Sequence, residues 1–143
     1  ASEALLRKLN EQITHELGAE MQYLAMSFWF ERENLQGMAK WFLAQAVEEH
    51  VHAMTLVTFL NEWDLPITLV SPPNPIHDFA HAEAVFEAAL GHEQRVTSQI
   101  TDIFKLALEE EVNARDNLAK IRMVGDNPAA LLEFDRHLGQ PAE

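Results

Sequence analysis

The sequence predicts an all-α protein built as an antiparallel bundle of long helices, and three observations support this. Apolar residues recur at three- and four-residue intervals along most of the 143 residues, which is the spacing of one helix face. Four of the six prolines fall within residues 66–75, so the long segments on either side are uninterrupted. The length, with 48% hydrophobic residues, suits a single domain with a real core over residues 1–143.

The first two helices are expected to pair as neighbours. Residues 3–32 keep the helical spacing of apolar side chains without a proline, and residues 38–63 do the same. The segment between them, residues 33–37, is short, polar and contains Gly37. The second helix should therefore turn back antiparallel to the first.

Residues 64–80 are predicted to form a crossover rather than a helix. Four prolines cannot lie inside a helix, and the segment is too long for a tight hairpin. We expect it to carry the chain along the bundle, so that the third helix starts near Phe79 at the far end.

The following stretch, residues 81–124, contains no convincing break. It is predicted as one helix of roughly 44 residues, about 66 Å long, although a compact four-helix bundle would need a turn near Leu108. Asn127, as an N-cap, and Pro128, at the first helical position, then mark a restart. A short last helix is expected over residues 129–138.

Three glutamates lie on or beside the apolar faces of three predicted helices. Glu49 falls on the apolar stripe of the second helix and His52 follows one turn later, so both side chains can point at one spot. Glu16 lies beside the stripe of the first helix, and Glu93 lies within that of the third. Because an unpaired carboxylate is costly to bury, a divalent metal held by Glu-x-x-His would supply the compensating charge. The alternative is that Glu49 is solvated and that His52, at the margin of the stripe, has its hydrogen bonds satisfied without a metal.

The chemistry of these side chains favours particular metals. Carboxylate oxygens with a single imidazole suit iron or manganese in a dinuclear site, whereas structural zinc favours thiolates, and the chain has no cysteine. Di-iron carboxylate bundles carry Glu-x-x-His on two helices, and this motif is found here on one. The second metal position should therefore be weaker and more open, which favours turnover over a permanently held cofactor.

The motifs, taken in order, resemble those of prokaryotic non-haem ferritins. They are LNEQITHEL, AQAVEEHVHAM, the proline-bearing crossover and GHEQ, and the similarity covers residues 5–108 and resumes over 109–139. The resemblance implies a ferritin-like four-helix bundle with a long crossover between the second and third helices and a short fifth helix. It also implies a homo-oligomeric cage of 24 subunits that oxidises Fe(II) with dioxygen or peroxide and stores ferric mineral.

The resemblance further implies a ferroxidase centre with assigned ligands. Glu16, Glu49 and His52 would surround one iron, and Glu49 and Glu93 the second, so that Glu49 bridges the pair. Tyr23 would be the nearby phenol, available for hydrogen bonding or transient electron donation.

Other residues near these motifs receive weaker roles. Glu48 and Glu110 match a third, looser iron position of prokaryotic members. His50 occupies the place of a haem-ligating Met in haem-binding relatives, so no haem is expected. His15 and His92 adjoin ligands in sequence and are expected to be solvated.

The chain departs from the family pattern near the junction of the third and fourth helices. Compared with the family pattern, about twenty residues are absent between GHEQ and the EEE run. Ala107, which cannot bind metal, takes the place of a side chain near the second iron. Either the protein contains a segment here that the printed sequence lacks, or the deletion is genuine and the two helices are fused. We favour the first explanation, because both flanks still resemble the family.

Charge and hydropathy narrow the possible partners. Ten Lys and Arg against 23 Asp and Glu give a net charge of −13, a surface that repels nucleic acid and anionic membranes. No run approaches a membrane span and the first residues lack a signal-peptide core, so we expect a cytoplasmic protein. Two other functions stay open: a rubrerythrin-like peroxide reductase, disfavoured by the lack of cysteine, and a helical scaffold with an incomplete metal site.

Overall fold

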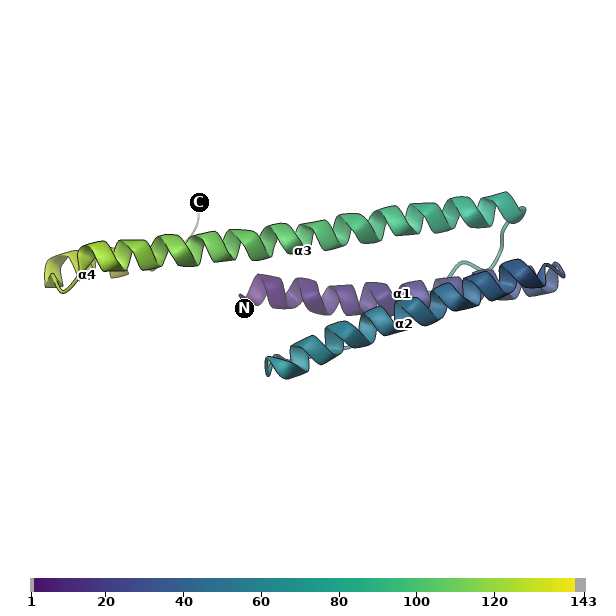
Figure 1. Cartoon of the computed structure of the whole chain (residues 1–143), viewed down its shortest axis with the longest axis horizontal. Coiled ribbons are helices and arrows are strands. Elements are labelled where there is room, and N and C mark those ends of the chain that lie inside the picture. Colours follow the sequence, from purple (N-terminus) through teal and green to yellow (C-terminus); the bar gives the residue numbers. More distant parts are fainter. Residues whose placement is uncertain (1, 141–143) are drawn as a thin grey trace. The chain divides into compact units, whose positions relative to one another are not determined.

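The computed structural model describes residues 2–140, and this part of the chain folds into four helices (Figure 1). The predicted all-α class is confirmed. Two compact units make up the chain, Ala1–Phe104 and Lys105–Glu143. The expectation of a single domain over residues 1–143 stays a prediction. The helices are α1 (Glu3–Arg32), α2 (Gln36–Glu62), α3 (Ala82–Val124) and α4 (Pro128–Leu138).

A tight turn places α1 and α2 side by side, as the sequence predicts (Figure 1). After α1, Asn34 adopts a left-handed backbone with φ of 59°, and the Leu35 amide donates to the Phe30 carbonyl at 2.9 Å. This arrangement satisfies carbonyls that the helix end would leave unpaired, and Asn tolerates the left-handed region. Asp64, with φ of 52°, ends α2 in the same way. The turn is shorter than expected, because α2 begins at Gln36 rather than Met38.

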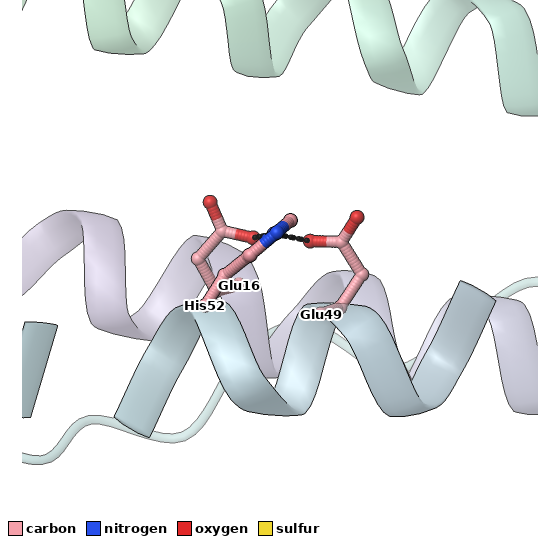
Figure 2. Close-up of side chains that lie close together, drawn as sticks. All are labelled: Glu16, Glu49 and His52. Atoms are coloured by element: carbon pink, nitrogen blue, oxygen red, sulfur yellow. Dashed lines mark ion pairs between the residues drawn. The ribbon is translucent and has the colours of Figure 1, made fainter. Parts of the chain in front are cut away.

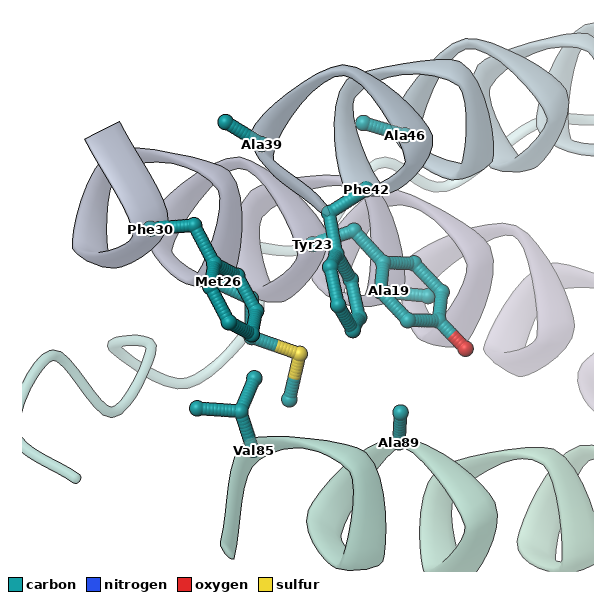
Figure 3. Close-up of a cluster of buried hydrophobic side chains, with 9 residues drawn as sticks. All are labelled: Ala19, Tyr23, Met26, Phe30, Ala39, Phe42, Ala46, Val85 and Ala89. Carbon is teal, nitrogen blue, oxygen red and sulfur yellow. The ribbon is translucent and has the colours of Figure 1, made fainter. Parts of the chain in front are cut away.

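The main core of the first unit is an aromatic cluster between α1, α2 and the start of α3 (Figure 3). Phe30 and Phe42 stack with ring centroids 5.3 Å apart, and Tyr23 lies 6.0 Å from Phe42. Val85 and Ala89 of α3 face these rings, and both are buried. The burial of large aromatic side chains therefore joins three helices at this end of the unit.

A second cluster lies toward the other end of the α1–α2 pair. Leu9, Ile13 and Leu60 are buried there, and Ile103 of α3 packs against them. Ile67 of the crossover packs on the same cluster, so part of the crossover contacts the bundle. The buried carboxylates of Glu16 and Glu49 lie along α1 and α2 between these two clusters.

The crossover, residues 63–81, has no helix or strand and is held to α1 by two side-chain amides. The Gln22 amide donates to the Ile76 carbonyl at 2.9 Å and accepts from the Ile76 amide at 2.8 Å. The Asn10 amide donates to the Pro66 carbonyl at 3.1 Å, and its oxygen accepts from the Thr68 amide at 2.7 Å. These hydrogen bonds satisfy backbone groups that a strand or helix would otherwise pair.

The third helix is continuous over 43 residues, with no turn at Leu108, which is the arrangement that the fused alternative requires. It begins at Ala82, three residues after the expected Phe79. The short helix predicted as the fifth is thus the fourth in chain order. Its predicted cap is confirmed, because the Asn127 side chain accepts from two amides of the first turn, each at 3.1 Å.

The described part of the second unit, residues 105–140, has no core of its own. No residue in the described range 105–140 is buried, although apolar side chains recur along it. None of the four helices within residues 2–140 combines the length and apolar character needed to cross a bilayer.

Candidate metal centre

Two carboxylates and one imidazole converge in the middle of the α1–α2 pair. Glu16 comes from α1, and Glu49 and His52 come from α2, where their spacing of three residues puts them on one face (Figure 2). The His52 Nδ1 atom lies 3.7 Å from Glu16 Oε2 and 3.5 Å from Glu49 Oε2. The three candidate ligand atoms all lie within 4.8 Å of one another. One divalent ion placed between them could contact all three.

The two carboxylates are buried, while the imidazole reaches solvent. Relative exposure of the side chain is 2% for Glu16, 6% for Glu49 and 57% for His52. The Oε2 atoms of both glutamates are buried without a hydrogen-bond partner among the described residues. Buried polar atoms are rarely left unpaired, so these two oxygens point to a ligand that would satisfy them.

The acidity of Glu49 differs from that of an exposed glutamate. Burial raises the pKa of Glu49 from its usual 4.5 to about 9, and interaction with Glu16 and repulsion from Glu93 and Glu48 act in the same direction. The metal-free site therefore holds a proton at neutral pH. A cation that binds here must displace that proton, because the ligand is the carboxylate.

Glu93 lies near this group but is not part of it. The Tyr23 hydroxyl donates to Glu93 Oε1, and Glu93 itself is exposed on α3. Burial raises the pKa of the Tyr23 phenol, and this hydrogen bond and the charge of Glu93 raise it further. Tyr23 and Glu93 thus form a hydrogen-bonded pair that is separate from the group of Glu16, Glu49 and His52. The charge of Glu93 connects the two, because it acts on Glu49.

The prediction for His92 is wrong. We expected a solvated side chain, but its Nε2 atom is buried without a hydrogen-bond partner among the described residues, and its ring meets Tyr23 edge-on at 5.5 Å. Burial lowers the pKa of His92, and repulsion from Arg95 adds to this. The ring is part of the packing around the phenol. His15, in contrast, is exposed as expected.

The remaining predicted residues lie outside the three-residue group. Glu48 is exposed on α2, and Glu110 is half-buried in the second unit, so the third iron position stays a prediction. His50 is exposed and its Nδ1 atom pairs with both oxygens of Glu20, the shorter distance being 3.0 Å.

Gln12 belongs to the site and was missed by sequence reasoning. It is 2% exposed, and its Nε2 atom donates to Glu16 Oε1 at 3.0 Å. The available signal was its position four residues before Glu16 on the same helix, where side chains meet.

Comparison with known proteins decides the family. A model of the ferritin-like domain matches residues 6–140. The chain belongs to the ferritin-like family. This confirms the resemblance that the motifs indicate, and the acidic group between α1 and α2 is therefore the candidate metal centre of a ferritin-like protein.

Bacterial relatives match nearly the whole chain. The bacterial non-heme ferritin of Campylobacter jejuni is 31% identical over 156 residues, covering 96% of this chain and 93% of that protein. A probable bacterial non-heme ferritin-like protein of Haemophilus influenzae is 27% identical over 157 residues, covering 96% and 95%.

Solved ferritin structures share the fold. A humanized archaeal ferritin is similar with a TM-score of 0.76 and 28% identity, covering 99% of this chain and 98% of that one. An open pore ferritin from the archaeon Archaeoglobus fulgidus is similar with a TM-score of 0.76 and 27% identity, covering 99% of each chain. The ferritin-like fold class is thus confirmed.

The alignment with the Campylobacter protein contains more positions than this chain has residues in it. It spans 156 residues, whereas 96% of 143 residues is about 137, so about 19 positions face no residue of this chain. That length agrees with the segment of about twenty residues that the sequence lacks relative to the family pattern.

Proposed function

We propose that this chain is an iron-storage protein that oxidises Fe(II) at a dinuclear carboxylate site. The observation that carries the proposal concerns the buried Oε2 atoms of Glu16 and Glu49. They have no hydrogen-bond partner within residues 2–140 and lie 3.7 and 3.5 Å from the Nδ1 atom of His52. A cation that replaces the proton of Glu49 would compensate both carboxylates in this dry site, and oxygen ligands with one imidazole suit Fe(II). Membership of a family whose similar members are named ferritins supports iron as that cation.

The residues divide the work between two Fe(II) ions, which are substrates of the reaction. Glu16, Glu49 and His52 would hold the first ion, and Glu49 with Glu93 the second. The spread of these groups supports the division, because Glu93 lies outside the three-residue group yet acts electrostatically on Glu49. The Tyr23 hydroxyl, which donates to Glu93, would orient that carboxylate toward the second ion.

The reaction balances as a two-electron transfer. Two Fe(II) ions lose one electron each, and dioxygen takes up two electrons and two protons to become hydrogen peroxide. Peroxide as the oxidant would instead take two electrons and two protons to give two waters. The exposed side of His52 provides an open approach for the oxidant, as a metal site that turns over requires.

Storage follows from release of Fe(III) into an enclosed volume. We propose that copies of this chain form a homo-oligomeric cage of 24 subunits, in which ferric mineral is deposited. The net charge of −13 supports this, because acidic surfaces concentrate iron cations around the protein.

Aerobic addition of Fe(II) to the purified protein tests the oxidation step. We expect ferric absorbance to rise rapidly in the parent protein and slowly in Glu49→Ala and His52→Ala, because each variant removes one ligand. Glu62→Ala and His50→Ala are matched controls on α2, since both residues are exposed and lie outside the metal group. Both controls should oxidise iron at the parent rate.

Equal rates in the parent, Glu49→Ala and His52→Ala would reject the site. The chain would then be a helical scaffold, or a surface that nucleates ferric mineral without a catalytic centre. Slow oxidation by the two controls as well would assign the effect to lost charge rather than to lost ligands.

A further inference from the structure

The metal group has a buried amide behind it. Gln12 lies one helical turn before Glu16 on α1, and both side chains are 2% exposed. The Gln12 Nε2 atom donates to Glu16 Oε1 at 3.0 Å. A hydrogen bond to a carboxylate inside a dry site is stronger than one at the surface, and charge-assisted bonds of this kind are roughly twice as strong as neutral ones.

This hydrogen bond makes the two oxygens of Glu16 different. Oε1 is occupied by Gln12, whereas Oε2 has no partner among the described residues and lies 3.7 Å from His52 Nδ1. The last torsion of a glutamate side chain is broad and intrinsically two-fold, so nothing in the residue itself fixes the plane of its carboxylate. An external donor on one oxygen supplies that missing constraint.

We propose that Gln12 is a positioning residue that makes Glu16 bind a divalent cation through Oε2 alone. The inference rests on the proposed function, since it assumes that the group of Glu16, Glu49 and His52 is a metal site. With Oε1 directed to the amide, Glu16 is placed as a terminal ligand through Oε2 rather than as a bridge between two ions. Glu49 is then left as the carboxylate that can bridge them.

The chemistry of an amide suits this role. Its N–H is a neutral donor, so it orients the carboxylate without cancelling the negative charge that attracts the cation. An arginine or lysine in its place would neutralise that charge, and a glutamate would add a second repelling carboxylate. Partners that orient metal ligands in this way typically change metal affinity by about 10- to 100-fold when they are removed.

Titration with Co(II) tests the inference on the full chain, because binding of Co(II) is read by its visible absorption without any oxidation of iron. Gln12→Met keeps the size of the side chain and removes the donor, and Gln12→Asn keeps the donor but withdraws it by one methylene. Both variants should bind Co(II) about 10-fold or more weakly. Their bound Co(II) should also absorb less intensely, because a freed Glu16 can bind through both oxygens and raise the coordination number.

Ser27→Ala is the matched control. Ser27 is also buried on α1, and its hydroxyl donates to the Ala39 carbonyl at 2.7 Å, away from the metal group. This variant should lose stability but bind Co(II) with the parent affinity and spectrum.

The outcomes separate the positioning role from the site itself. Parent-like affinity and spectrum in both Gln12 variants, with Co(II) binding intact, would overturn the positioning role and leave the metal site standing. Equal loss of affinity in Ser27→Ala would also overturn it, because the effect would then come from general destabilisation. Failure of the parent protein to bind Co(II) would overturn the proposed function, and this inference with it.

Discussion

The raised pKa of Glu49 predicts that the metal-free protein becomes more stable when this residue is replaced by glutamine. In the folded chain Glu49 keeps its proton up to a pKa of about 9, whereas in the unfolded chain it loses the proton at about 4.5. Between these values the folded state binds more protons than the unfolded state, so the stability of the parent protein falls as pH rises through this window. Glu49→Gln is neutral at every pH and removes this dependence.

The magnitude follows from the two pKa values. At pH 7 the unfolded chain has lost the proton of Glu49, and folding must take it up again. Since pH 7 lies 2.5 units above the unfolded pKa of 4.5, at about 1.36 kcal/mol per unit, this lowers the free energy of unfolding by about 3 kcal/mol. The same relation gives less than about 1 kcal/mol at pH 5 and about 5 kcal/mol at pH 8.5. Glutamine should recover these amounts, because its amide fits the same space and can donate to Glu16.

Urea unfolding in the presence of a chelator measures this effect. The free energy of unfolding of the parent and of Glu49→Gln would be compared at pH 5, 7 and 8.5, at one fixed chain concentration. Glu62→Gln, an exposed position on the same helix, is the control and should change stability little at any of the three values. A difference between parent and Glu49→Gln that stays constant from pH 5 to pH 8.5 would refute the reasoning, because it would exclude proton uptake as the cause.

Four further outcomes are expected. Phe42→Ala removes a fully buried ring of the aromatic cluster and should lower the free energy of unfolding in urea by about 3–5 kcal/mol. A loss no larger than that of a surface substitution would contradict the described core. Gln22→Ala removes both hydrogen bonds to Ile76 and should lower the free energy of unfolding by about 1–2 kcal/mol. Proteolysis of the crossover should become faster, and an unchanged cleavage rate would contradict this role of Gln22. Asn127→Ala should destabilise α4 by about 1 kcal/mol, which faster amide hydrogen exchange in its first turn would reveal. Equal exchange rates in the variant and the parent protein would exclude the cap. The intact mass of the purified chain should be 16.2 kDa if α3 is a genuine fusion of the family's third and fourth helices. A mass about 2 kDa higher would show an additional segment.

Local pattern was sufficient to predict the helices. The apolar spacing predicted α1 to the residue, and the absence of Gly and Pro around Leu108 predicted the unbroken α3. Asn127 was predicted as a cap because the rule depends on a few neighbouring residues. The start of α2 was two residues early, since the left-handed conformation at Asn34 made the turn tighter than its composition indicated.

The candidate site was predicted less completely. Glu49 and His52 lie three residues apart on one helix, so their convergence could be derived from the sequence. The pairing of Glu16 with them required α1 to pack on α2 in one register, which periodicity does not fix. The burial of the His92 Nε2 atom and the hydrogen bond from Gln12 to Glu16 depended in the same way on which neighbours the folded chain supplies.

The sequence by itself determined which residues are helical and which helix faces carry carboxylates, because helical periodicity and capping act over a few residues. Tertiary structure alone decided that Oε2 of Glu16 has no hydrogen-bond partner in the described part of the chain, while Oε1 accepts from Gln12. It also decided that Tyr23 takes Glu93 as its acceptor. The physical reason is that hydrogen-bond partners and burial are set by packing between helices, over distances in sequence that no local pattern spans.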